Sequence, residues 1–215
     1  MKLPKLSRGF TLTEFLVVLA VVLLLALLLP AWSSPKRKAS RVQCMNNLKQ
    51  VSTAFRLWGG GFGGTNGYYP AHVTTNTGGA LELAAQGEVF RIFQVMSNEL
   101  NTPKILICPA DTRTAAASFG TLSNANLSYF VSVDADEANP RMLLLGDRNL
   151  TLNGLTGLRG LVALPTNAPV GWVRTNLHRT EGFVGLADGS VQQATAARLR
   201  QFLAASGRTN RLAIP

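Results

Sequence analysis

A long apolar segment near the N-terminus constrains this 215-residue chain more than any other feature. Residues 15–32 contain no charged or strongly polar side chain. Counted from Phe10 to Leu29, the segment has twenty residues, and at 1.5 Å per residue a helix of that length spans the roughly 30 Å core of a bilayer. Pro30 has no backbone N–H and clashes with the preceding turn, so the helix should kink or end there. The sequence predicts a transmembrane helix over residues 10–32.

A single carboxylate, Glu14, stands at the head of this segment, after three cations at Lys2, Lys5 and Arg8. An ionised side chain at the centre of a membrane helix costs about 2.5–3.5 kcal/mol on insertion scales, and somewhat less near the interface. We therefore expect Glu14 to have a partner of opposite charge. A newly formed amino terminus is the nearest candidate.

This region resembles the class III leader of type IV pilins and of the pseudopilins of type II secretion systems, in the string Gly9-Phe10-Thr11-Leu12-Thr13-Glu14. The resemblance implies that prepilin peptidase cuts between Gly9 and Phe10 and that the new N-terminal residue is methylated. It also implies that Glu14 faces the terminal amine of a neighbouring pilin or pseudopilin subunit during assembly. The other implied partners are an assembly ATPase, an inner-membrane platform and the lipid bilayer.

The location implied by the resemblance is the bacterial inner membrane, with a single span, a periplasmic head domain, and assembly into an envelope or extracellular filament. Charge alone does not decide this orientation, because three cations precede the span and four follow it. The four are Lys36, Arg37, Lys38 and Arg41. They can complement the C-terminal end of the helix dipole or contact lipid phosphates. Removal of a leader over residues 1–9 would lower the formal net charge from +10 to +7, and we expect no nucleic acid partner.

Two other interpretations of the N-terminus stay open. In an ordinary secretory signal, Ala31-Trp32-Ser33 would be a small-x-small cleavage site and the mature chain would begin at Ser34. The segment could instead be a plain membrane anchor. Either would make the chain a membrane-anchored or secreted periplasmic binding domain or hydrolase. For a filament subunit, the sequence leaves open whether the filament serves secretion, a pilus, DNA uptake or adhesion.

A second helical pattern follows over residues 33–58. Apolar residues recur there at intervals of three and four, as in an amphipathic helix. They are Val42, Met45, Leu48, Val51, Phe55 and Trp58. The segment 44–50 is similar to the Cys-x-x-Asn-Leu-Lys-Gln motif of a large pilin-like subfamily. This resemblance implies a pilin-like fold of the α+β class. In that fold a long N-terminal helix, membrane-spanning in its first half and amphipathic in its second, packs on a small antiparallel sheet.

Residues 59–215 would form one head domain. Their pattern predicts a glycine-rich surface loop over 59–69, a short helix over 88–100 and a strand over 104–108. Further strands are predicted over 127–133, 142–145, 160–164 and 183–187.

The C-terminal part carries a hairpin signal. Asp188-Gly189 stands between the strand predicted over 183–187 and the segment Ser190-Val191-Gln192, and it predicts a type I′ turn, in which both central residues have positive φ. A final helix should begin near Thr195 and be closed by Gly207.

The chain has two cysteines, Cys44 and Cys108. In an oxidising compartment a bridge between them would stabilise the fold by several kcal/mol through loop closure. A pair of buried free thiols is the alternative. Neither cysteine has metal-ligand spacing, because no second cysteine or histidine follows within a short loop.

The string from His178 to Gly189 fits His-x9-Asp-Gly, with Asp188 as its aspartate. Together with Asp111 in Cys-Pro-Ala-Asp and Asp147 in Leu-Gly-Asp-Arg, it resembles the C-terminal signature of the same pilin-like subfamily. These residues offer neither a catalytic triad nor a His-x-x-x-His or His-Glu-x-x-His metal motif. We therefore predict structural roles, no catalytic residues and no enzyme activity.

The expected structural roles are local. Asp188 would hold its turn, His178 would bond a backbone or carboxylate group, and Asp147 would pair with Arg148 or Arg113. We expect no cofactor, with one alternative that the resemblance leaves open. Some secretion pseudopilins hold calcium in a C-terminal loop, which here would lie near Asp188.

Overall fold

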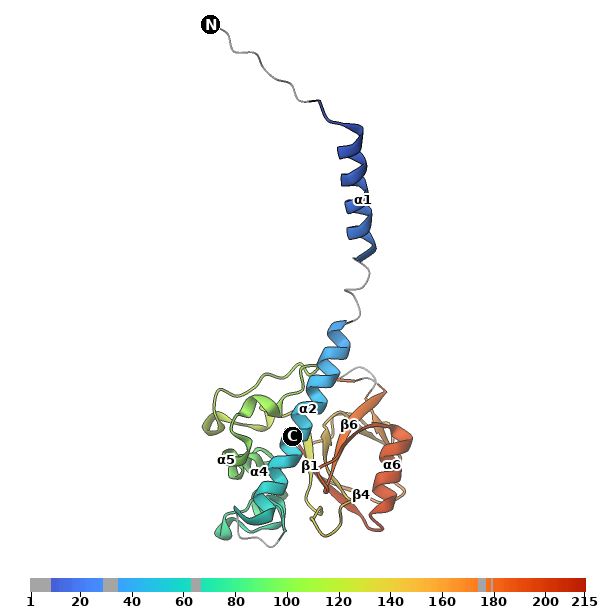
Figure 1. Ribbon diagram of the computed structural model, residues 1–215. Coiled ribbons are helices and arrows are strands. Elements are labelled where there is room, and N and C mark those ends of the chain that lie inside the picture. Colours follow the sequence, from blue (N-terminus) through green and yellow to red (C-terminus); the bar gives the residue numbers. More distant parts are fainter. Residues whose placement is uncertain (1–8, 29–34, 63–66, 174–176, 179) are drawn as a thin grey trace. The chain divides into compact units, whose positions relative to one another are not determined.

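The computed structural model describes residues 9–28, 35–62, 67–173, 177–178 and 180–215. The chain divides into two compact units, Met1–Lys38 and Ala39–Pro215, and each is described by itself. Figure 1 shows the helices and strands of both units.

The first unit contains helix α1 (Leu12–Leu28) and the first residues of α2 (Pro35–Leu57). From Phe15 to Leu25, the large apolar side chains of α1 are about half exposed, from 46% at Leu19 to 65% at Leu24. No helix in the described part of the chain is both long enough and apolar enough to cross a membrane. Residues 29–32 of the predicted span, including the predicted break at Pro30, lie outside the described residues.

Helix α2, whose described part begins at Pro35, confirms the helix predicted over residues 33–58, and from Ala39 onward it belongs to the second unit. Most of the predicted apolar stripe is buried, but the prediction was wrong for Val42, which is 52% exposed. The chain also does not leave the helix at Gly59. It widens into one π-helical turn, η2 (Trp58–Phe62). The buried members of the stripe are Leu48, Val51, Phe55 and Trp58, and Met45 is partly buried.

Six strands form one antiparallel sheet in the order β4-β8-β1-β2-β6-β7. They are β1 (Tyr129–Ser132), β2 (Leu143–Asp147), β4 (Gly160–Leu164), β6 (Glu181–Leu186), β7 (Val191–Thr195) and β8 (Asn210–Ile214). A separate antiparallel pair consists of β3 (Leu150–Leu152) and β5 (Val170–Trp172). The predicted antiparallel sheet is confirmed, whereas β3, β5 and β8 were not predicted.

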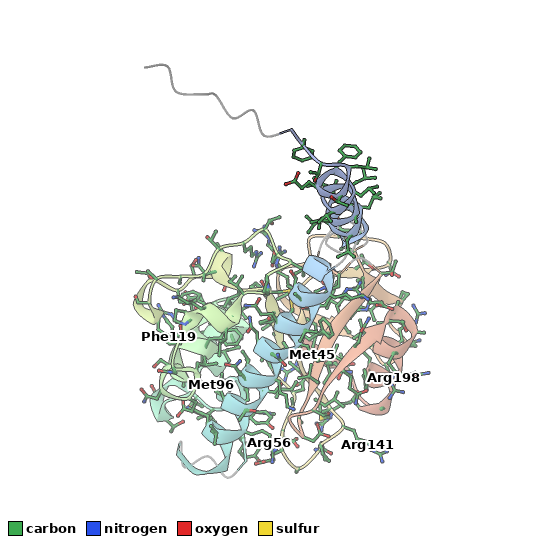
Figure 2. The ribbon with its side chains drawn as sticks, turned by 45° about the horizontal axis from the view of Figure 1, so that its top comes forward. Met45, Arg56, Met96, Phe119, Arg141 and Arg198 are labelled. Atoms are coloured by element: carbon green, nitrogen blue, oxygen red, sulfur yellow. A yellow bond between two sulfur atoms is a disulfide. The ribbon has the colours of Figure 1, made fainter. Side chains whose placement is uncertain are left out.

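Each face of the six-stranded sheet carries a buried layer. Successive residues of a strand point to opposite faces. Tyr129 and Val131 of β1 therefore pack in the cluster that contains the α2 stripe, and Phe130 packs in the cluster that contains α6 (Ala196–Ala205). In Figure 1, α2 lies between the sheet and the segment that carries α4 and α5. In Figure 2, Met96 lies on one side of α2 and Arg198 of α6 on the other. The head is thus an α+β domain consistent with a pilin-like fold.

Along the chain, the helices that follow α2 and precede β1 are short. They are α3 (Leu81–Ala85), α4 (Phe90–Val95) and α5 (Ser97–Leu100), with 3₁₀ turns η3 (Pro70–His72), η4 (Thr75–Thr77), η6 (Phe119–Thr121) and η7 (Asn124–Asn126). The single helix predicted over 88–100 is therefore two helices, because the backbone leaves the helical conformation at Met96. In the predicted loop over 59–69, residues 63–66 lie outside the described part.

The strand predicted over 104–108 was wrong. The chain forms a 3₁₀ turn there, η5 (Pro103–Leu106). Pro103 occupies the first position, where a missing N–H costs nothing, and the hydroxyl of Thr102 accepts a hydrogen bond from the N–H of Lys104 at 3.4 Å. These two residues favour the start of a 3₁₀ turn more strongly than the following apolar run favours a strand.

The hairpin between β6 and β7 is confirmed, but its turn is not type I′. Gly189 has a φ of 84°, whereas Asp188 does not have a positive φ. The N–H of Gly189 donates to the carbonyl of Leu186 at 2.9 Å, and the N–H of Leu186 donates to the carbonyl of Ser190 at 2.9 Å. This is a three-residue loop with glycine in the left-handed position.

The final helix follows β7 as predicted. The hydroxyl of Thr195 accepts a hydrogen bond from the N–H of Arg198 and caps α6, and Gly207 has the positive φ of 66° that ends such a helix.

Candidate functional sites

Glu14 lies in the first turn of α1, and Thr11 directly precedes that helix. One carboxylate oxygen of Glu14 accepts hydrogen bonds from the N–H of Thr11 at 2.9 Å and from its hydroxyl at 2.8 Å. The hydroxyl oxygen of Thr11 in turn accepts a bond from the N–H of Glu14 at 3.3 Å. This reciprocal arrangement is a capping box, and Glu14 therefore has a partner within its own chain.

The capping box was missed in the sequence, although Thr-x-x-Glu before an apolar run is its usual signal. Gly9 and Phe10, between which the expected cleavage falls, precede the helix, and both are exposed. Removal of residues 1–9 would leave Thr11 and Glu14 in place, so the capping box is compatible with a processed chain.

The second candidate site is a buried group of four side chains in the head domain, which we call the Cys-Cys-His-Asp cluster. It consists of Cys44 on α2, Cys108 after η5, Asp147 at the end of β2, and His178 before β6. Cys44 and Cys108 form a disulfide with a Cα–Cα distance of 4.8 Å. All four residues are buried, and their ligand-type atoms lie within 4.8 Å of one another.

The contacts within the cluster are short. Nε2 of His178 lies 3.4 Å from Sγ of Cys108 and 3.8 Å from Oδ2 of Asp147. Oδ1 of Asp147 lies 3.8 Å from Sγ of Cys44, and Oδ2 accepts a hydrogen bond from the N–H of Phe183 at 2.8 Å. The ring of Phe183 packs edge-on against the imidazole of His178, with centroids 4.8 Å apart. The cluster is therefore held by neighbours on the sheet.

Burial controls the charge states of the cluster. It raises the pKa of Asp147 to about 7, although the hydrogen bond from Phe183 lowers that pKa. It lowers the pKa of His178 to about 4, and the nearby positive charge of Arg41 lowers it further. The imidazole is thus neutral at pH 7, and its approach to Asp147 is not an ion pair.

Arg41 was expected to contact lipid phosphates or the helix dipole. Instead, its guanidinium donates to the carbonyl of His178 at 3.4 Å and lies 3.5 Å from the carboxylate of Glu181. These contacts form because the first turns of α2 in the head domain run past the segment before β6, and contact of Arg41 with lipid stays a prediction.

The expected pairing of Asp147 with Arg148 or Arg113 was wrong. Arg148 instead donates two hydrogen bonds to Asp111, at 2.9 and 2.8 Å, and Ser128 donates a third at 2.8 Å. Asp147 instead accepts a hydrogen bond from the N–H of Phe183.

The side chain of Asp188 bonds within its own turn. Its Oδ1 accepts a hydrogen bond from the N–H of Ser190 at 2.8 Å. Its carbonyl oxygen accepts one from Arg56 at 3.2 Å, and a Cβ on Gly189 would lie 3.0 Å from the same arginine side chain. Calcium near Asp188 stays an untested prediction. Among the described residues, the group of His, Cys, Asp and Glu side chains close enough to share an ion is the Cys-Cys-His-Asp cluster.

Residues 4–30 match the prokaryotic N-terminal methylation motif. No curated protein and no solved structure matches the chain. The motif indicates a membrane-associated precursor of the type IV pilin or pseudopilin kind, which prepilin peptidase cleaves and which assembles with other pilin subunits. The match ends at residue 30, so the resemblance of the head to a subfamily with His-x9-Asp-Gly stays a prediction.

Proposed function

We propose that this chain is a structural, non-catalytic subunit of a type IV pilus-like or type II secretion filament. In this proposal prepilin peptidase cuts after Gly9, residues 10–32 cross the bacterial inner membrane once, and the head domain lies in the periplasm. An assembly ATPase and its inner-membrane platform then move the subunit into the filament.

The main support for this proposal is that the methylation motif coincides with a helix, α1, whose apolar side chains are exposed. The motif covers the expected cleavage site and α1. Within its own unit, α1 leaves its large apolar side chains about half exposed. Such a surface needs a cover, and lipid before assembly and neighbouring copies of α1 after assembly would supply it.

Glu14 can contribute to assembly in two ways. Its negative charge can pair with the terminal amine of a neighbouring subunit, as the resemblance implies. Its carboxylate can also cap α1 through Thr11, as the structure shows. The two roles are separable, because glutamine at this position of a capping box also accepts from the N-cap N–H but carries no charge.

We therefore expect Glu14→Gln to abolish or strongly impair assembly, as Glu14→Ala should, when filaments are sheared from cells and quantified by immunoblot. Wild-type assembly by Glu14→Gln would show that capping alone explains the residue and would contradict charge pairing. Thr11→Val, which loses the side-chain cap but keeps the charge, serves as the matched control and should retain most assembly.

The processing step has its own test. N-terminal sequencing of the mature chain should begin at Phe10, and mass spectrometry should show a methylated α-amine. A mature N-terminus at Ser34 would contradict the proposal and favour a secreted domain with an ordinary signal sequence.

A further inference from the structure

The Cys-Cys-His-Asp cluster brings four metal-ligand side chains to one point inside the head domain. Two sulfurs, one imidazole nitrogen and one carboxylate come from four separate elements. Cys44, Cys108 and Asp147 are fully buried and His178 is 4% exposed. The sequence did not predict a metal site here, because no two of these residues have the spacing of a ligand motif.

The distances fit a tetrahedral metal ion. With zinc bonds of about 2.3 Å to sulfur and about 2.0–2.2 Å to nitrogen and oxygen, two ligand atoms at the tetrahedral angle lie roughly 3.3–3.8 Å apart. The observed separations are 3.4 Å from Sγ of Cys108 to Nε2 of His178, 3.8 Å from Sγ of Cys44 to Oδ1 of Asp147, and 3.8 Å from Nε2 of His178 to the other carboxylate oxygen of Asp147, Oδ2. All the ligand-type atoms of the cluster lie within 4.8 Å of one another, and the two bonded sulfurs would have to separate for all four residues to bind one ion.

The carboxylate supplies an independent observation. Oδ2 of Asp147 is engaged by the N–H of Phe183, whereas Oδ1 is directed at Sγ of Cys44, 3.8 Å away. A disulfide sulfur carries no proton, so in the oxidised chain Oδ1 gains no hydrogen bond from Cys44. Among the described residues no other donor to this fully buried oxygen is found, and such an atom is costly to leave unsatisfied.

We propose that the reduced Cys-Cys-His-Asp cluster binds one zinc ion through Cys44, Cys108, Asp147 and His178, and that formation of the disulfide releases it. Four protein ligands of mixed sulfur, nitrogen and oxygen type in a closed, buried site are the arrangement of a structural zinc centre rather than a catalytic one. The hydrogen bond from Phe183 to Asp147 orients one ligand, and the packing of Phe183 against His178 orients another. This inference does not depend on filament assembly.

The exchange between the two states balances. An external disulfide takes two electrons from the two zinc-bound thiolates and two protons from solvent, and becomes a dithiol. Cys44 and Cys108 form the S–S bond, and zinc leaves as Zn²⁺. In the reverse direction a dithiol reduces the disulfide, and zinc binding displaces the protons of the two thiols.

The test uses the full-length chain in detergent. The chain is reduced with a thiol reductant in the presence of a chelator, and reductant and chelator are then removed. Titration with Zn²⁺ against a chromogenic chelator should give one ion per reduced chain and at least about 100-fold weaker binding by the oxidised chain, which has lost two of its four ligands. The Co²⁺ derivative should show thiolate-to-metal charge-transfer and tetrahedral d–d absorption. Equal affinity in both redox states, or no stoichiometric binding by the reduced chain, would overturn the proposal.

Substitutions at His178 test the ligand set directly. His178→Gln should weaken zinc binding by more than the roughly 10- to 100-fold that loss of an outer-shell partner costs. His178→Cys provides a new ligand, so it should restore tight binding and raise the charge-transfer intensity of the Co²⁺ derivative by about half, in proportion to its third thiolate.

The other histidine of the chain provides the matched control. His72 lies outside the cluster, and His72→Gln should bind zinc as the wild type does. Circular dichroism of the oxidised variants checks that each retains its fold. If His178→Gln fails that check, the spectrum of His178→Cys decides, and an unchanged charge-transfer intensity would exclude His178 as a ligand.

Discussion

At the scale of single residues, Asp111 shows how the head domain accommodates a buried charge. Its side chain is 2% exposed, and Arg148, which pairs with it, is 19% exposed. Burial by itself raises the pKa of Asp111, but the hydrogen bonds from Arg148 and Ser128 outweigh burial and hold the pKa below its ordinary value. The folded chain therefore stabilises the ionised carboxylate.

We expect Arg148→Met to lower the free energy of unfolding by about 3–5 kcal/mol at pH 7, because it leaves the Asp111 charge buried and unpaired. Since the pKa of Asp111 is lowered by folding, its stabilising contribution is present above the ordinary pKa and is lost as the pH falls through the folded value. The difference between wild type and variant should shrink below about pH 4. Urea unfolding of the full-length chain in detergent at several pH values measures both effects.

Arg208 provides the control for this prediction. Its guanidinium lies 4.0 Å from Asp136 and its side chain is 54% exposed. Arg208→Met should change the free energy of unfolding by no more than about 1 kcal/mol. Similar losses in the two variants would mean that burial of the Asp111 pair has no special importance.

At the scale of elements, the contact between α2 and β6 depends on two small residues. A Cβ on Gly185 would lie 2.6 Å from the hydroxyl oxygen of Ser52 and 3.0 Å from Leu145. The φ of Gly185 is not positive, so close packing rather than backbone conformation requires glycine here. The helix that carries Cys44 can approach the sheet because β6 has no side chain at this point.

Gly185→Ala should therefore lower the free energy of unfolding by about 1–3 kcal/mol through overpacking. Ser52→Ala removes the nearest clashing atom, so the double variant should recover part of that loss and show coupling of about 0.5–3 kcal/mol in a double-mutant cycle. Gly120→Ala is the control, since its nearest neighbour would be 3.7 Å away. Strict additivity of the two changes would contradict the proposed contact.

At the scale of the whole molecule, the Cys44–Cys108 disulfide links helix α2 to the segment that follows η5. The two residues are 64 positions apart. A cross-link over a loop of this length restricts the unfolded chain substantially. The bond therefore stabilises the packing of α2 in the head domain independently of the contacts that α2 makes with the sheet.

Reduction of the disulfide in the presence of a chelator should lower the free energy of unfolding by about 4 kcal/mol, measured by urea unfolding of the full-length chain. Chelator without reductant should have no effect. Addition of Zn²⁺ to the reduced chain should return part of the loss, because an ion bound to the folded state alone stabilises it. Unchanged stability on reduction would contradict a structural role for the disulfide.

Sequence patterns predicted local elements better than distant pairings. The strand over 160–164 was correct to its last residue, because a short apolar run bounded by turn residues is a local signal. The strand β8 was missed, because it gains its stability from β1 and β4, which pair with it on either side. The error at residues 104–108 came from weighing an apolar run above the capping signals of Thr102 and Pro103.

The two candidate sites also differ in how far the sequence could predict them. The site around Glu14 is contiguous in the chain, so its motif could be read directly, and only the hydrogen bonds with Thr11 were missed. In the head, the spacing of Cys44 and Cys108 excluded a metal motif because each cysteine was judged with its sequence neighbours. Asp147 and His178 join them only through the pairing of β2 with β6 and the packing of α2 on the sheet.

The sequence by itself determined the N-terminal features of this protein: an apolar helix, a carboxylate at its start and a processing motif before it. These features depend on neighbouring residues and on the energetics of apolar surface, which act before any tertiary contact forms. The tertiary structure alone decided that two cysteines, an aspartate and a histidine share one buried site. Contacts between distant segments form only when the sheet pairs and its core excludes water, and no local pattern encodes that placement.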